Sequence, residues 1–255
     1  MIVADYHTHT VYSHGTGSVL ENAMVAKEKG LKEIAITDHG FSHMAFNLKR
    51  SKLKDLRRDI DEAMAKTGVK IYLGVEANLM NYDGDVDINE EDLKTLEIVV
   101  MGYHKGIKNG IKGFLGFSMG NIIADFLKIR TKRRIEKNTQ SYIRALERYP
   151  IDIISHLNLT AKVDVKKVAE ACVKTNTYIE INCKRIHFTK AEVEAMLKTD
   201  VKFVIDSDAH SPQRVGDDEL GLEVAKMYGI PFDRIVNLNG LINIKQKNCK
   251  ILPKS

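Results

Sequence analysis

The stretch that decides the fold is Met1-Ile2-Val3-Ala4-Asp5-Tyr6-His7-Thr8-His9-Thr10, at the start of the chain. The apolar run from Met1 to Ala4 predicts a β-strand, and polar residues follow where this strand should end. Side chains alternate faces along extended backbone, so His7 and His9 should point the same way, close enough to bind one ion. Ordinary polar residues at a strand end would look the same, so the pair must be interpreted together with the other histidines.

Beyond this stretch, strand-like and helix-like segments alternate about seven times. The apolar strands show little polar alternation, which is typical of buried parallel strands that are flanked by helices. The further strands are predicted at residues 33–37, 70–75, 98–101, 151–154, 178–182 and 202–205. Helices are predicted at residues 18–29, 48–66, 90–95, 165–174, 190–197 and 219–228, with a long basic helix that ends near residue 148.

The ends of these strands favour a barrel over an open sheet. Polar residues follow all seven predicted strands, and in a closed or nearly closed β/α barrel such ends converge on one pocket. An open doubly wound sheet would instead concentrate its ligands at one switch point. No linker or internal repeat divides the chain, so residues 1–255 are expected to form a single domain.

The composition excludes several classes of protein. Hydrophobic content of 44% and charged content of 29% are typical of a soluble globular protein, and the net charge of +5 suits either an anionic substrate or a solvated surface. Cys172, Cys183 and Cys249 are odd in number and lack C-x-x-C spacing, which argues against a disulfide framework or a thiolate zinc site. Neither a signal peptide nor a membrane-spanning stretch is apparent, so a cytoplasmic protein is expected.

Nine histidines and carboxylates lie at, or just beyond, the C-terminal ends of the predicted strands. They include seven of the nine histidines of the chain. The other two, His43 and His187, fall further into loops and are expected to be loop or surface residues. The candidate ligands are His7, His9, His14, His39, Glu76, His104, His156, Asp208 and His210.

Imidazole and carboxylate groups together suit Zn, Mn or Fe. Nine such groups are too many for one tetrahedral ion, so they would serve two or three ions, with a carboxylate such as Glu76 bridging two of them. Metal ions about 3.5 to 4 Å apart can activate water and stabilise the leaving oxygen of a phosphoryl transfer. Hydrolysis of a phosphate ester is therefore the expected chemistry.

The strand-end motifs resemble those of the PHP (polymerase and histidinol phosphatase) family, in order and over nearly the whole chain. The resemblance is closest to the YcdX-like single-domain metal-dependent phosphatases, which share residues 81–87 and 180–182. It implies a distorted (β/α)7 barrel, similar to a TIM barrel, with a trinuclear site that usually holds zinc. The matching motifs are Asp5 to Thr10, Thr37-Asp38-His39-Gly40, Gly74 to Asn78, Gly102-Tyr103-His104, Ile154-Ser155-His156 and Ser207-Asp208-Ala209-His210.

The resemblance also distributes the ligands over three ions. The first would take His7, His9, Glu76 and Asp208; the second would take Glu76, His104 and His156; the third would take His14, His39 and His210. A metal-bound hydroxide would attack phosphorus, with Glu76, Asp208 and His210 as participants. The chain departs from the subfamily at Leu157, where a proline often stands, and in the longer and more basic segment Lys105 to Arg134.

Several other residues carry two interpretations. Asp5, Asp38 and Asp206 either orient a metal ligand or only cap a turn. Arg185 and Arg214 follow the sixth and seventh strands, where a guanidinium either binds the substrate phosphate or forms a surface salt bridge. The basic run from Lys128 to Arg134 could bind a polyanion but lacks interleaved aromatic residues, so a solvated helix face is favoured.

The predicted function is that of a metal-dependent phosphoesterase acting on a small phosphorylated substrate, with three divalent ions, most readily Zn. A 3′-5′ exonuclease or nucleotide phosphatase is the alternative among hydrolases. A non-catalytic metal-binding regulatory module is the alternative from another class. No membrane partner is expected, and no feature of the sequence specifies the substrate or an oligomeric state.

Overall fold

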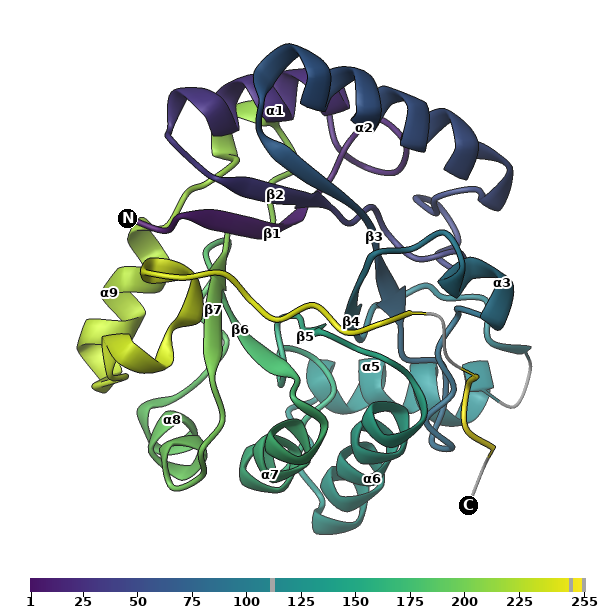
Figure 1. The fold of residues 1–255 in the computed structure, drawn as a ribbon. Helices are drawn as coiled ribbons and strands as arrows, with labels where there is room; N and C mark the ends of the chain where they lie inside the picture. Colours follow the sequence, from purple (N-terminus) through teal and green to yellow (C-terminus); the bar gives the residue numbers. More distant parts are fainter. Residues whose placement is uncertain (111–112, 248–249, 254–255) are drawn as a thin grey trace.

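Seven parallel strands, hydrogen-bonded in chain order, form the centre of the molecule (Figure 1). The computed structural model describes residues 1–110, 113–247 and 250–253. Cys249 therefore lies outside the described residues, as do Ile111 and Lys112 of the segment from Lys105 to Arg134. The strands are β1 (Ala4–Thr8), β2 (Glu33–Ile36), β3 (Lys70–Asn78), β4 (Ile98–Gly102), β5 (Ile153–Ile154), β6 (Tyr178–Asn182) and β7 (Phe203–Asp206).

The sheet closes where β1 meets β7, which makes the fold a distorted (β/α)7 barrel, as the sequence predicts. Here the pairing is short: the His9 amide donates to the Ala209 carbonyl at 2.8 Å, and the Ala209 amide donates to the His7 carbonyl at 3.3 Å. Further down the seam, the buried Asn237 side chain donates to Ala4 O at 2.9 Å and to Ile205 O at 2.6 Å. A side-chain amide thus replaces part of the missing ladder.

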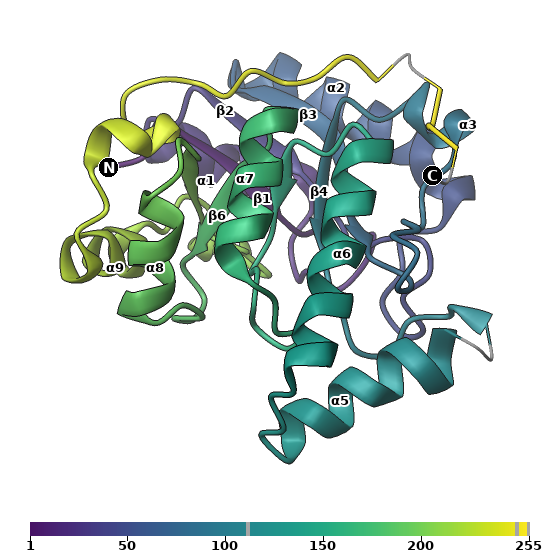
Figure 2. The ribbon, with the colours of Figure 1, turned by 90° about the horizontal axis from the view of Figure 1, so that it is seen from below.

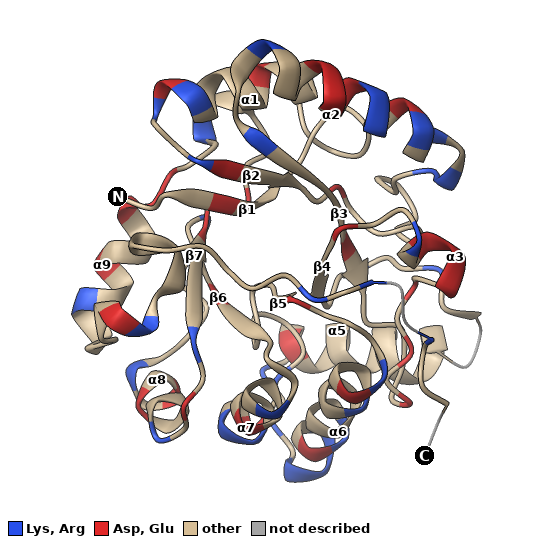
Figure 3. Ribbon diagram, in the orientation of Figure 1, with Lys and Arg blue, Asp and Glu red and all other residues tan. Residues whose placement is uncertain are grey.

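Helices surround the barrel on the outside (Figure 1). Ser18 and Glu21 form the predicted capping box at the start of the first helix. Along α2, acidic and basic residues alternate on the solvent side (Figure 3), as expected for a helix with one face on the core. The helices are α1 (Val19–Glu28), α2 (Leu53–Thr67), α3 (Glu90–Leu93), α5 (Met119–Phe126), α6 (Lys132–Arg148), α7 (Val165–Thr175), α8 (Lys190–Leu197) and α9 (Glu219–Tyr228).

Alternation along the strands divides the core into two parts. Ile34 and Ile36 of β2 belong to the large core that includes the helices, whereas Ala35 between them belongs to a smaller cluster with Tyr6 and Ile242. This strand therefore contributes apolar side chains to both of its faces, as buried parallel strands do. No helix in the part of the chain that the structure describes is long and apolar enough to cross a membrane.

Two predicted boundaries are wrong. The first strand is formed by residues 4–8 rather than 1–4, so it includes His7 itself. The long basic helix is two helices, α5 and α6, separated by residues 127–131. The interruption has a local cause: Lys128 has a left-handed backbone with φ of 56°, and the Thr131 side chain then caps α6.

The two ends of the barrel differ in what covers them. Figure 2 shows the C-terminal segment after α9 crossing one end of the barrel, with α5 at the opposite end. The first of these is the N-terminal end of the strands, where the Ile242 amide donates to the Tyr6 hydroxyl at 3.2 Å and Lys247 pairs with Asp152 at 2.6 Å. The C-terminal ends of the strands carry the candidate ligands.

Candidate metal centre

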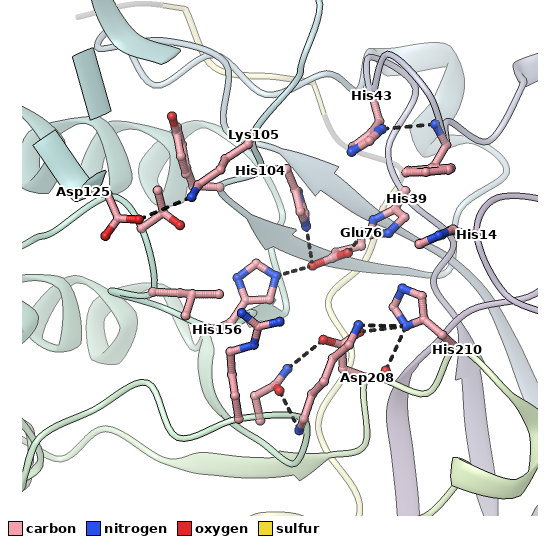
Figure 4. Close-up of a pocket in the computed structure, with 17 residues that line it drawn as sticks. His14, His39, His43, Glu76, His104, Lys105, Asp125, His156, Asp208 and His210 are labelled. Atoms are coloured by element: carbon pink, nitrogen blue, oxygen red, sulfur yellow. Dashed lines mark hydrogen bonds and ion pairs between the residues drawn. The ribbon is translucent and has the colours of Figure 1, made fainter. Parts of the chain in front are cut away.

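Glu76 lies at the centre of the candidate site (Figure 4). It belongs to β3, which continues to Asn78, and its side chain is almost completely buried. Both carboxylate oxygens face imidazole nitrogens from other strand ends. Oε2 lies 3.0 Å from His39 Nδ1 and 3.4 Å from His7 Nε2, while Oε1 lies 3.1 Å from His104 Nε2 and 2.8 Å from His156 Nε2.

His7 and His9 point to the same side of the first strand, as the alternation predicts. Their Nε2 atoms are 3.1 Å apart, and His9 Nε2 lies 3.3 Å from Asp208 Oδ1. Asp208 reaches this position with a left-handed backbone, φ 49°, and His156 on the opposite side has φ 28°. Such conformations are uncommon for residues other than glycine, and they cluster at functional sites.

His14 and His210 complete the group on the side of the first loop. The rings of His9 and His210 are 4.2 Å apart, whereas His14 is 5.2 Å from His210 and stacks on Phe46 at 3.9 Å. His14 thus lies at the edge of the group. Three sets of ligand atoms converge within 4.8 Å: His9, His39 and His210; His7, His9 and Glu76; and His39, Glu76 and His104.

Two residues that were not among the candidate ligands hold the histidine rings in place. Glu180 Oε1 lies 2.5 Å from His7 Nδ1, and its other oxygen accepts the His156 amide at 2.6 Å. Asn78 Oδ1 lies 2.8 Å from His104 Nδ1. By accepting a hydrogen bond from Nδ1–H, each residue favours the tautomer whose Nε2 lone pair is free to bind a metal ion.

The polar atoms of the site fit divalent cations. His9 Nδ1, His39 Nδ1, Glu76 Oε2 and His104 Nε2 are buried without a hydrogen bond. Burial alone would raise the pKa of Glu76, but the neighbouring His104 and His7 outweigh it and hold that pKa well below its usual range. Burial and the charge of His39 hold the pKa of His9 well below its usual range, which favours the neutral, metal-binding imidazole.

Seven of the nine candidate ligands line an open pocket of about 400 Å³, and His7 and His9 are buried beside them. Lys184 and Arg185, which follow β6, line this pocket, and Lys184 Nζ lies 3.6 Å from Asp208 Oδ1. Arg214 lies elsewhere: it donates to the Cys183 carbonyl at 3.1 Å and pairs with Asp217. Lys184 could have been found from its position directly before Arg185.

The three ambiguous aspartates contact the backbone and hydroxyl groups. Asp38 accepts from the Thr10 amide and hydroxyl, which fixes the loop that leads to His14. Asp5 accepts from the Ser207 hydroxyl, and Asp206 Oδ1 accepts from the Tyr6 amide. Among the described residues, none of the three hydrogen-bonds to a histidine ring, so their contacts match the structural interpretation.

The two remaining histidines differ from one another. His43 lines the pocket, and its ring stacks on that of His39 at 5.3 Å. His187 Nδ1 instead donates to the Leu157 carbonyl at 2.8 Å, which supports the loop after His156. His43 is therefore closer to the site than its loop position indicated.

Comparisons with known proteins agree with the geometry. The PHP domain family model matches residues 5–184. A probable phosphatase of Shewanella piezotolerans is 30% identical over 92% of this chain and 89% of its own length. A probable phosphatase of Thermoanaerobacter sp. is 32% identical over 98% of this chain and 97% of its own length. The crystal structure of histidinol phosphate phosphatase from Lactococcus lactis, complexed with Zn, L-histidinol and phosphate, has a similar fold, with a TM-score of 0.61, 14% identity and 98% of each chain covered.

Proposed function

The chain belongs to the PHP domain family, and from this premise we propose that it is a metal-dependent phosphoesterase that hydrolyses a small phosphorylated substrate. The observation that carries the proposal is the Glu76 carboxylate, which has four imidazole nitrogens within 3.4 Å at the open end of the barrel. The curated relatives of nearly full length, which are named probable phosphatases, support it. The proposed domain is the whole chain, since Asp208 and His210 lie beyond the matched residues and yet face His9.

The proposed cofactors are three divalent ions, most readily Zn. When bound, such ions supply an activated water and the positive charge that a phosphoryl group requires during transfer. Glu76 lies between two groups of histidines, which suits a carboxylate that bridges two ions. The proposed ligands are His7, His9, His14, His39, Glu76, His104, His156, Asp208 and His210.

The residues around the ligands suit binding of a phosphate. Lys184 and Arg185 place cationic groups on one wall of the pocket, where they can bind phosphate oxygens. Asp208 and His210 lie next to Lys184 and fix its position, with the Lys184 ammonium 3.2 Å from His210 Nδ1. Arg214, whose guanidinium is engaged with Cys183 and Asp217, has no part in this arrangement.

Elemental analysis combined with a substrate panel tests the proposal. The purified protein is re-metallated separately with Zn, Mn and Fe, its metal content is measured, and each form is assayed on p-nitrophenyl phosphate, sugar phosphates, histidinol phosphate and single-stranded oligonucleotides. We expect more than one ion per chain and turnover of small phosphate monoesters. Faster turnover of oligonucleotides would favour the exonuclease alternative. A fully loaded protein that hydrolyses none of these compounds would be a metal-binding module, and the proposal would be wrong.

A further inference from the structure

A second cavity, here called the basic cavity, lies beside the metal centre. Its walls come from the end of α5, the start of α6 and the loop that follows His156, and they include Lys128, Arg130, Arg134 and Lys162. Asp125 and Thr160 line both the basic cavity and the pocket of the metal centre. A molecule bound at the metal centre therefore has the basic cavity as its immediate neighbour.

Three of the four positively charged side chains of the basic cavity lack a carboxylate partner among the described residues. Within residues 1–110, 113–247 and 250–253, no carboxylate lies within 4 Å of the charged groups of Arg130, Arg134 or Lys162. The single acidic residue in the walls, Asp125, is shared between Lys105 at 3.3 Å and Lys128 at 4.0 Å. Four cations around one small cavity repel each other, and this repulsion would be relieved by an anion.

Two further features of the cavity walls favour an anion. Among the described residues, the buried Arg134 Nε has no hydrogen-bond acceptor, which is costly for a charged group. The N-terminus of the 17-residue helix α6 opens at the same place, with Thr131 as its cap and no acidic residue in its first turn. A helix N-terminus presents free amides and partial positive charge, both of which favour an anion.

Lys162 shows the electrostatic cost directly. Burial and the positive charge of Arg130 lower its pKa, and the carboxylates of Glu192 and Asp125 offset only part of this effect. Its ammonium donates to the Asn158 carbonyl at 2.5 Å, a neutral acceptor that does not cancel its charge. An anion bound nearby would stabilise the charged form of Lys162 and of its neighbours.

We propose that the mouth of the basic cavity, where Lys128 and Arg130 are exposed, binds a second anionic group, a phosphate or a carboxylate, of the same substrate whose phosphate ester is hydrolysed at the metal centre. The interior of the cavity, about 10 Å³, admits no more than a water-sized molecule. The inference rests on the proposed function and narrows its substrate class to phosphate monoesters that carry another anionic group. It also assigns a role to the basic run from Lys128 to Arg134, which is otherwise without one.

Kinetics on paired substrates test this proposal in the metal-loaded enzyme. The substrates are α,ω-alkanediol bisphosphates of increasing chain length, each compared with the monophosphate of the same diol. We expect kcat/KM for at least one bisphosphate to exceed that of its monophosphate by about tenfold or more, through a lower KM. The double variant Arg130→Gln, Lys162→Gln should reduce this ratio to less than about twofold, whereas Lys132→Gln, at an exposed position at the start of α6, should preserve it.

A sulfate titration separates a substrate group from a free anion. Sulfate can also bind at the metal centre of both proteins, so the sulfate effect is taken as the rise in Tm of the wild type minus that of the double variant, and it should be positive. A sulfate effect without any preference for bisphosphates would mean that the cavity holds a free anion, and the substrate assignment would be overturned. If the wild type shows no preference for bisphosphates but binds single-stranded oligonucleotide, and the double variant does not bind it, the substrate assignment would be overturned in favour of nucleic acid. If no ester is hydrolysed at all, the proposed function fails, and the absence of a sulfate effect would then refute the anion site separately.

Discussion

Two buried glutamates, one at each end of the barrel, differ in how their oxygens are used. At the N-terminal end, Glu33 accepts from the Tyr6 hydroxyl at 2.7 Å and from the Tyr72 hydroxyl at 3.2 Å. At the C-terminal end, Glu76 is equally buried, but its Oε2 has no hydrogen bond although two imidazole nitrogens lie within 3.4 Å. Burial by itself does not distinguish the two carboxylates. What distinguishes them is that both oxygens of Glu33 accept hydrogen bonds from the protein, whereas Oε2 of Glu76 accepts none among the described residues.

The same contrast extends to the neighbours of these residues. At the N-terminal end, Asp152 accepts from the Val99 and Lys245 amides, each at 2.8 Å, and pairs with Lys247. Every one of these contacts satisfies a polar group of the protein with another. At the C-terminal end, the histidines instead point their ring nitrogens toward the Glu76 carboxylate and toward one another. The first end is built for stability, and the second keeps polar atoms available for ligands.

The largest expected effect appears when Glu→Gln is made separately at each end of the barrel. Glu76→Gln replaces a carboxylate that faces four imidazoles with an amide that can bridge no ions, so activity should fall about a thousandfold or more, with a loss of bound metal. Glu33→Gln is the matched control, and should keep both metal content and kcat. Metal analysis and steady-state kinetics check this, and a fully active, fully loaded Glu76→Gln protein would contradict the proposed centre.

Asp152→Ala, at the N-terminal end, should have the opposite outcome: a loss of stability without a loss of activity. It removes the carboxylate that pairs with the buried Lys247 ammonium and accepts from two backbone amides, so the free energy of unfolding should fall by about 3 kcal/mol. For a chain of this size the Tm should drop by roughly 6 to 12 °C. Well below the new Tm, kcat should not change. Thermal unfolding and assays at low temperature measure the two effects, and a change in kcat without a change in Tm would refute the division between the ends.

Glu180→Gln should produce a smaller effect that is confined to the metal centre. The amide keeps the size of the side chain but presents a donor to either His7 Nδ1 or the His156 amide, both of which need an acceptor. Loss of such an orienting contact should weaken metal binding about tenfold to a hundredfold. Competition with a chelator measures the affinity. Unchanged affinity would indicate that Glu180 serves packing alone.

The smallest expected effect is the pH dependence of stability at the N-terminal end of the barrel, where Lys245 lies. Burial lowers the pKa of Lys245 from 10.5 to about 8, against the opposing attraction of Asp152. Between these values the unfolded chain binds more protons than the folded one, so the free energy of unfolding should rise with pH by on the order of 1 kcal/mol. The rise is measured as the difference between wild type and Lys245→Met in urea unfolding across this range. A constant difference would contradict the prediction.

The sequence was sufficient to predict the barrel and the convergence of nine residues because both follow from one rule. Parallel strands of a barrel end on the same side, so polar residues after successive strands must meet. His7, Glu76 and His156 are far apart in the chain, and their strand-end positions alone brought them together. Which atoms bind which ion does not follow from that rule.

Other features depend on side-chain geometry that no periodicity encodes. Glu180 lies inside a strand rather than after it, and only the packing of β6 beside β5 turns it toward His7. The break between α5 and α6 depends on the left-handed backbone of Lys128, in a run that otherwise has helical character. The basic cavity required that break, since it brings Arg130 next to Lys162 from a different loop.

The short seam between the first and last strands has a consequence for how the protein is made. The Ser207 amide donates to Asp5 across 202 positions of sequence, close to where His7 and His9 meet Asp208. During synthesis the first strand emerges long before its partner, so the candidate ligands cannot all come together until the chain has been made as far as His210. Contacts of such long range form slowly, because much of the chain must first be ordered. A metal site that needs residues from both strands therefore forms only after the last strand has paired with the first.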